Sequence, residues 1–99
     1  MKTFAERVYS ITAQIPKGKI ATYKDIAEQM NTKAYRAVGT ALKKNPHAPR
    51  VPCHRVINSD GALGGFAHGL PKKIKMLQEE GIQIKNNRID LGKFQHRWT

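Results

Sequence analysis

Apolar residues recur at every third or fourth position in four stretches of the chain, which is the spacing of amphipathic helices. In the first stretch, residues 3–15, the side chains of Phe4, Val8, Ile11 and Ile15 share one helical face. The Pro-Lys-Gly-Lys run at residues 16–19 ends this pattern as a turn. The other three helices are predicted over residues 22–30, 33–44 and 70–80.

The second and fourth helices also carry end signals. Thr22 is a typical N-cap residue, and Asp25, three positions later, completes the pattern of a capping box. Gly81 follows the fourth helix at a position where glycine commonly ends helices. These residues indicate the helix ends independently of the apolar spacing.

Only a short polar break, Asn31 and Thr32, separates the second helix from the third. The third helix opens with Lys33, Tyr35 and Arg36. Two helices joined in this way have the outline of a helix-turn-helix, although many helical bundles share it.

The remaining segments predict turns and short strands. Residues 45–52 hold three prolines and are expected to be non-helical, whereas residues 62–69 form a glycine-rich loop. An Asn-Ser-Asp-Gly turn predicts a short β hairpin near residues 58–63. A second hairpin and a basic, aromatic end are predicted for the tail at about residues 82–99.

A chain of 99 residues has room for one compact core, so residues 1–99 are expected to form a single domain. The pattern predicts an α+β fold that is mostly helical, with a winged-helix-like helix-turn-helix and small β hairpins. We expect this domain to be a monomer.

Charge changes this picture most. Lys and Arg number 18 against 7 acidic residues, which gives a net charge of +11 and a pI near 10.2. A solvated basic surface is one explanation, but such an imbalance on a small domain favours a polyanionic partner, most simply nucleic acid. Without a long apolar run or a signal-like N-terminus, the expected location is the cytoplasm, or the nucleus in a eukaryote.

The single cysteine and four histidines are scattered without the spacing of a structural zinc site. No cofactor motif is present either, so neither a metal nor an organic cofactor is expected. One cysteine also excludes an internal disulfide.

That cysteine, Cys53, has unusual neighbours. A lone cysteine is most often a small buried hydrophobe. Here Pro52 restricts the preceding backbone, while His54 and Arg55 place basic groups beside the sulfur. Such neighbours favour the nucleophilic thiolate form, although His54 is equally compatible with a structural role.

The run Pro52-Cys53-His54-Arg55-Val56 resembles the active-site motif of the O6-alkylguanine-DNA alkyltransferases. The resemblance extends from about Phe4 to Gly81, with its motifs in the family's order. It includes Ile15-Pro16-Lys17-Gly18-Lys19 leading to Tyr23, then Arg36-Ala37-Val38-Gly39, Asn45-Pro46 and the Gly61–Gly69 loop.

The resemblance implies a catalytic set. Cys53 is expected to accept the alkyl group, and His54 to deprotonate it through a water. Glu80 is expected to orient the imidazole, in the nucleophile, base and orienter arrangement. Tyr23 is expected to assist rotation of the base and to donate a proton to the leaving guanine.

The resemblance also implies how DNA is held. Arg36 is similar to the arginine that fills the gap left by a flipped nucleotide, and Asn45 to the hinge between the helix-turn-helix and the active-site loop. The helix is expected to enter the minor groove. The remaining DNA-binding residues are expected to be Thr32, Lys33, Tyr35 and Arg55, and the base-pocket residues Val56, Phe66, Ala67 and Lys73.

These roles predict a methylated-DNA–protein-cysteine S-methyltransferase that acts on double-stranded DNA containing O6-alkylguanine. Because sulfur alkylation gives a stable thioether, each molecule is expected to act once. Three side chains differ from the family pattern: Phe66 replaces a frequent tyrosine, Ala67 replaces a serine that binds the guanine O6, and Tyr35 is bulkier than the small residue often found beside the arginine.

Two alternatives remain at this stage. Alkyltransferase-like proteins are similarly short, have a similar basic tail, and bind the lesion to recruit other repair proteins without transferring the group. However, their defining change is loss of the cysteine, and this chain has a cysteine at that position, Cys53. A plain helix-turn-helix transcription regulator explains the charge but leaves the Pro-Cys-His-Arg-Val run without a role.

Overall fold

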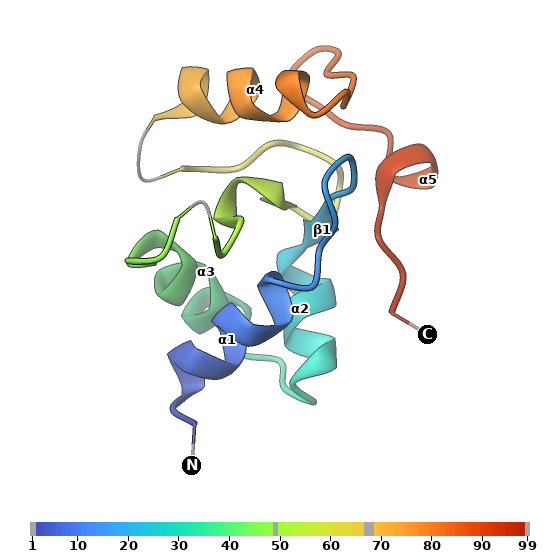
Figure 1. Ribbon diagram of the computed structural model, residues 1–99. Helices are drawn as coiled ribbons and strands as arrows, with labels where there is room; N and C mark the ends of the chain where they lie inside the picture. Colours follow the sequence, from blue (N-terminus) through green and yellow to red (C-terminus); the bar gives the residue numbers. More distant parts are fainter. Residues whose placement is uncertain (1, 49, 67–68, 99) are drawn as a thin grey trace.

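The computed structural model describes residues 2–48, 50–66 and 69–98 (Figure 1). Most of its regular structure is helical, as the apolar spacing predicts. The elements in chain order are α1 (Phe4–Thr12), β1 (Ala21–Thr22), α2 (Tyr23–Gln29), α3 (Tyr35–Lys43), the 3-10 turn η1 (Cys53–Arg55), β2 (Val56–Ile57), α4 (Leu70–Glu79) and α5 (Leu91–Phe94).

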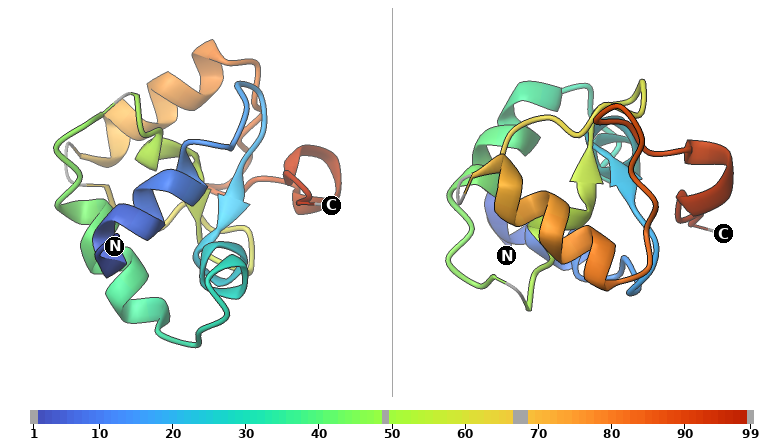
Figure 2. Two further views of the ribbon diagram at one scale, coloured as in Figure 1. Left: turned by 60° about the horizontal axis from the view of Figure 1, so that its bottom comes forward. Right: turned by 90° about the horizontal axis from the view of Figure 1, so that it is seen from above.

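A two-stranded parallel sheet separates two apolar cores. β1 pairs with β2, with Ala21 opposite Val56 and Thr22 opposite Ile57. Ala21 and Val56 belong to the core shared with α1, α2 and α3, whereas Ile20 and Ile57 belong to the core under α4. The two strands lie side by side (Figure 2). Because successive strand residues point to opposite faces, β2 contributes one residue to each core, whereas β1 contributes Ala21 to the first core and is preceded by Ile20 in the second.

Hydrogen bonds at their N-termini stabilise α1 and α2. The predicted capping box is confirmed: the Thr22 side chain accepts from the Asp25 amide, and the Asp25 carboxylate accepts from the Thr22 amide. Thr3 and Glu6 form a second box at the start of α1. Both boxes satisfy backbone donors that a helix start otherwise leaves unpaired.

Helix boundaries differ modestly from the apolar pattern. The first helix ends at Thr12 rather than Ile15, because residues 13–15 continue as turns. The third begins at Tyr35 rather than Lys33, because the Thr32 hydroxyl accepts from the Ala34 amide and holds the connection in a turn. None of the helices in the described ranges is long and apolar enough to cross a membrane.

The first hairpin prediction, near residues 58–63, is wrong in its pairing. A turn forms, in which the Gly61 amide donates to Asn58 and the Asn58 amide donates to the Ala62 carbonyl, but Ala62 then pairs antiparallel with Arg88 and the local pairing extends no further. The second hairpin exists as one tight turn in which Lys85 pairs with Arg88. Its two central residues are asparagines with positive φ, the geometry that suits a two-residue hairpin.

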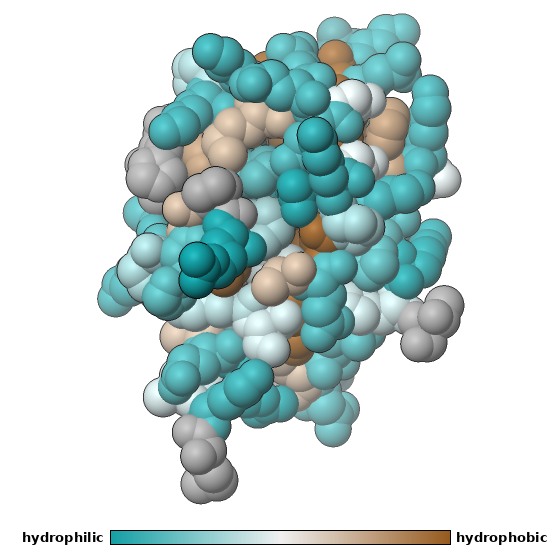
Figure 3. Space-filling view, viewed as in Figure 1, coloured by the Kyte–Doolittle hydropathy of each residue, from teal (hydrophilic) through white to brown (hydrophobic). Residues whose placement is uncertain are grey.

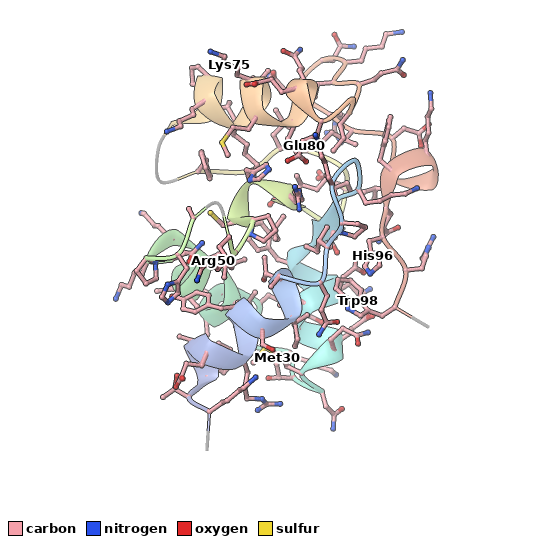
Figure 4. All side chains as sticks on the ribbon, viewed as in Figure 1. Met30, Arg50, Lys75, Glu80, His96 and Trp98 are labelled. Carbon is pink, nitrogen blue, oxygen red and sulfur yellow. The ribbon has the colours of Figure 1, made fainter. Side chains whose placement is uncertain are left out.

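The C-terminal segment runs along the outer edge of β1. Phe94 accepts from the Ile20 amide, and the His96 amide donates to the Ile20 carbonyl. Side chains add two more ties: Gln95 Nε2 donates to Asp25 at 2.7 Å, and Trp98 Nε1 donates to Gln14 at 2.7 Å. His96 and Trp98 also stack edge to face (Figure 4). The segment contains α5, which the apolar pattern did not predict.

Replacement of Gln95 with alanine tests this tie. The variant loses a hydrogen bond to the carboxylate that caps α2, and we expect the free energy of unfolding to fall by about 1 kcal/mol. Urea unfolding followed by circular dichroism measures the change. Gln29→Ala, at an exposed position of α2, is the matched control and should change stability by less. Equal stability of both variants would contradict a stabilising role for the hydrogen bond between Gln95 and Asp25.

Candidate functional site

Cys53 forms part of the wall of a cavity of about 300 Å³, a volume within the range of small-molecule sites. Helices α2 and α3 form one side of this cavity, and the loop that precedes α4 forms another. The lining residues are Tyr23, Gly39, Leu42, Lys43, Cys53, Gly65 and Phe66.

The backbone before Cys53 is fixed by the end of α3. Asn45 Nδ2 donates to the Val51 carbonyl at 2.9 Å, and the Cys53 amide donates to the same carbonyl at 2.8 Å. Asn45 therefore braces the segment between α3 and the active-site turn. Cys53 itself begins the 3-10 turn η1 and is 9% exposed.

His54 and Arg55, the next two residues of η1, share one carboxylate. Glu80, the C-cap residue of α4, accepts from Arg55 through both of its oxygens, at 2.8 and 2.7 Å (Figure 4). Its Oε2 also lies 2.9 Å from His54 Nε2. The Arg55 guanidinium also donates a hydrogen bond to the Ile15 carbonyl at 2.8 Å. Arg55 and Glu80 thus join α4, η1 and the turn after α1.

These contacts set the protonation states. Burial lowers the pKa of His54, against the hydrogen bond and charge of Glu80, which raise it. Burial alone raises the pKa of Glu80, but the hydrogen bonds from Arg55 and His54 outweigh it and the net pKa is lowered. At neutral pH the pair is therefore a neutral imidazole beside a carboxylate, in which Nε2–H donates and Nδ1 is the nitrogen that can accept a proton.

Tyr23 approaches the cavity from the first position of α2. Burial raises the pKa of its phenol, and negative charge on Cys53 raises it further. The phenol therefore keeps its proton at neutral pH and can act as a donor toward the cavity.

A surface groove of about 700 Å³ shares Tyr23 and Gly39 with the cavity and so lies next to it. Arg36 and Tyr35, at the start of α3, line this groove and are exposed. Lys33 and Thr32 line a further hollow beside Tyr35. The face of the molecule drawn in Figure 3 is mainly hydrophilic, in keeping with the net charge of +11.

The structure places five of the predicted site residues in the lining of the cavity or the groove. Cys53, Tyr23 and Phe66 line the same cavity. His54, the residue after Cys53, lies within hydrogen-bond distance of Glu80. Arg36, Tyr35, Lys33 and Thr32 lie on the surface around the start of α3. Ala67 lies outside the described residues.

Three predicted residues have other positions. Arg55 is an internal brace rather than a DNA-contacting side chain, because its nitrogens bind Glu80 and Ile15. Asn45, by contrast, lies between α3 and η1, where the predicted hinge would be, and bonds to the backbone of this segment. Val56 and Lys73 are fully buried and do not line the cavity.

The cavity also contains residues that the sequence pattern did not single out: Gly39, Leu42, Lys43 and Gly65. Arg36, Gly39 and Lys43 are spaced three and four residues apart, so they share one helical face. That spacing was a usable signal once Arg36 had been assigned. Gly65 follows from no local pattern.

Fold and site together define a small helix-turn-helix domain with a cysteine at a cavity and a histidine–glutamate pair behind it. The family model of the 6-O-methylguanine DNA methyltransferase, DNA-binding domain, matches residues 3–82. The chain belongs to this family, as the motif resemblance implies.

Curated relatives are longer than this chain. It is 46% identical over 85 residues to the methylated-DNA–protein-cysteine methyltransferase of Sulfolobus acidocaldarius, covering 86% of this chain and 54% of that protein. It is 44% identical over 88 residues to a bifunctional methyltransferase/endonuclease of Picrophilus torridus, covering 88% of this chain and 30% of that protein. The chain thus spans about half, or less, of the relatives it matches.

Solved structures share the fold. Schizosaccharomyces pombe Atl1, in complex with damaged DNA containing O6-carboxymethylguanine, superposes with a TM-score of 0.86 at 30% identity, covering 98% of this chain and 99% of that chain. Mycobacterium tuberculosis OGT in complex with DNA gives a TM-score of 0.77 at 41% identity, covering 81% and 50%. The predicted fold class, mostly helical with a small β component, is confirmed.

Replacement of Glu80 with glutamine tests the shared carboxylate. We expect the free energy of unfolding at pH 7 to fall by about 2 kcal/mol, because Arg55 and His54 lose a charged acceptor in a poorly solvated position. The lowered pKa of Glu80 makes this stabilisation complete above pH 4.5, its ordinary value, and lost as the pH falls through the lower folded-state value.

Urea unfolding of wild type and variant at pH 7 and pH 3 measures both effects. The stability difference should shrink at pH 3. Glu79→Gln, which changes the neighbouring exposed residue, should show neither effect. If the stability difference between wild type and Glu80→Gln is the same at both pH values, the ionised Glu80 carboxylate does not stabilise the fold through Arg55 and His54.

Proposed function

We propose that this chain repairs duplex DNA by moving the alkyl group of O6-alkylguanine onto Sγ of Cys53, once per molecule. The observation that carries the proposal is the position of Cys53 at a cavity wall shared with Tyr23, with His54 of the same turn bound to Glu80. The chain's membership in the 6-O-methylguanine DNA methyltransferase family supports it.

The cavity is the reason why the damaged base has to leave the helix. Cys53 is 9% exposed, so its sulfur cannot reach an O6 group that is stacked inside a duplex. The neighbouring groove, with Arg36 at the start of α3, suits a DNA backbone from which one nucleotide is rotated into the cavity. Arg36 then occupies the space that the base leaves.

The transfer step balances with this chain's own groups. The thiol proton passes to Nδ1 of the neutral His54 through a water, and Glu80 stabilises the imidazolium that results. The sulfur attacks the alkyl carbon, forming an S–C bond while the C–O6 bond breaks. The bonding pair goes to the guanine, which takes a proton from the Tyr23 phenol.

One specific observation favours a second function, lesion binding without transfer. The likeness to Atl1, whose structure contains damaged DNA, extends over 98% of this chain, whereas the likenesses to OGT cover 81 to 93% of it. The C-terminal segment after residue 82 lies beyond the family match. A protein of this kind would hand the lesion to other repair proteins.

Intact-protein mass spectrometry separates the two functions. After incubation with duplex DNA that contains one O6-methylguanine, we expect wild-type protein to gain one methyl group, located on the peptide that contains Cys53. Cys53→Ser is the control and should gain none. Tight lesion binding with an unchanged mass supports the sensor instead, and binding that depends on sequence but not on the lesion supports a regulator.

Arg36→Ala tests the role of the groove. We expect about a tenfold loss of preference for lesion over undamaged duplex, because base rotation loses the side chain that fills the gap. Lys33→Ala is the control: it should weaken binding to both duplexes alike and reduce the salt dependence, as for a phosphate contact. Fluorescence of 2-aminopurine beside the lesion reports the rotation, and identical behaviour of the two variants contradicts the assignment to Arg36.

A further inference from the structure

The surface groove beside the cavity is lined from two parts of the chain. Lys24 and Arg36 contribute positive charge from α2 and α3. The turn over residues 58–61 contributes the other part, and its Asp60 is the only acidic residue in the described part of the lining. Because like charges repel, a carboxylate at this position weakens the attraction of the groove for a phosphate backbone. The surroundings of Asp60 show what compensates its charge.

Asp60 has a local structural role in this turn. Its Oδ1 accepts from the Ala62 amide at 2.9 Å, which is the way in which aspartate commonly stabilises a turn. The backbone of the turn is also bonded to the C-terminal segment, because the Ile89 amide donates to the Gly61 carbonyl at 2.9 Å. The turn that lines the groove and the tight hairpin over residues 85–88 are therefore held together.

Arg88, the last residue of this hairpin, places its guanidinium beside Asp60. Its Nη1 donates to the Asp60 carbonyl at 3.0 Å and lies 3.7 Å from the carboxylate oxygen Oδ2. The side chains of Arg88 and Asp60 are 58% and 62% exposed. An ion pair that is this open to water contributes little to stability, so the fold gains little from it. Its effect is on the charge at the edge of the groove.

The protein uses only part of the Arg88 guanidinium. Arginine carries five N–H donors in a planar fork. In the described part of the protein, the bond from Nη1 to Asp60 is the only hydrogen bond of the Arg88 side chain. Arg55, by contrast, uses Nε, Nη1 and Nη2 for Glu80 and Ile15. Arg88 thus keeps Nε and Nη2 for a ligand, and a phosphate matches two such donors in geometry and charge.

We propose that Arg88 binds a backbone phosphate of duplex DNA on the side of the groove formed by residues 58–60, and that Asp60 holds the guanidinium in position. The proposal rests on the proposed function, which brings duplex DNA to this groove. Arg88 lies beyond residue 82, where the family match ends, so the DNA-binding surface extends past the part of the chain that matches the family. Arg36 and Arg88 then hold the duplex from two parts of the chain while the damaged base rotates.

The salt dependence of binding tests this contact. Anisotropy of a labelled, undamaged duplex gives the binding constant over a range of KCl concentrations. Arg88→Gln keeps an amide donor for Asp60 but removes the charge. We expect about fivefold weaker binding at about 0.1 M salt, and a slope of log binding constant against log salt that is smaller in magnitude by about one, as for one lost phosphate contact.

Lys93→Gln is the matched control. Lys93 is an exposed cation of the same segment, but its ammonium bonds to Gln83 instead of the groove turn. Its removal should leave the slope at the wild-type value. Equal slopes for Arg88→Gln and Lys93→Gln overturn the proposal.

Neutral phosphates locate the contact. A duplex with one O6-methylguanine fixes the register of the bound protein, and single methylphosphonate linkages remove the charge of one phosphate at a time. Wild type should lose about fivefold in affinity at one or two phosphates where Arg88→Gln loses nothing further. Identical responses at every phosphate overturn the proposal. A wild type that binds lesion and undamaged duplex alike counts against the proposed function, whereas the salt slopes still decide the role of Arg88.

A measurement on the wild-type protein applies if Arg88→Gln does not fold. When undamaged duplex is added, the Nε–H resonance of Arg88 should shift and its exchange with water should slow, because a phosphate oxygen accepts from the guanidinium. An Arg88 resonance that stays unchanged, at DNA concentrations that shift the backbone amides of α3, overturns the proposal.

Discussion

The structure depends on one carboxylate, Glu80 at the end of α4. It accepts hydrogen bonds from Arg55 and lies within hydrogen-bond distance of His54, and Arg55 in turn reaches the Ile15 carbonyl after α1. Ionic groups in poorly solvated positions stabilise a fold only when each of them is paired with good geometry. The same contact also orients His54, the residue after Cys53, whereas burial is what lowers the pKa of the histidine and keeps it neutral.

The protein is small, and its two apolar cores meet at a sheet of only two short strands. β2 has only two residues, yet its alternating side chains contribute to both cores, and Ile20 and Ala21 do the same at the start of β1. The C-terminal segment then protects the free edge of β1 and bonds to Asp25, the residue that caps α2. Because Tyr23 is the first residue of α2, the position of this tyrosine depends on contacts made by the last residues of the described chain.

Buried charge is concentrated where chemistry is proposed. Lys73 of α4 bonds to Val56, the residue that follows η1, and Glu80 at the end of α4 bonds to Arg55 and lies 2.9 Å from His54, both in η1. A fold selected for stability alone gains little from such groups, since apolar side chains of similar size often stabilise as well or better. Their presence beside a cysteine is the expected signature of a site in which protonation states are controlled.

The sequence by itself determined the helices, the capping box at Thr22 and the chemistry around Cys53, because periodicity and capping are local and a motif occupies adjacent positions. It also indicated the helix-turn-helix and the basic character of the surface.

Only the tertiary structure decided the strand pairing, the use of the tail and the roles of Arg55 and Lys73. Pairing of residues 21–22 with 56–57 joins segments more than thirty positions apart, so no local pattern predicts it. A basic side chain looks the same in sequence whether it binds phosphate or an internal carboxylate. Its role is set by which acceptors the fold brings within about 3 Å of it, a distance that depends on every packed element at once.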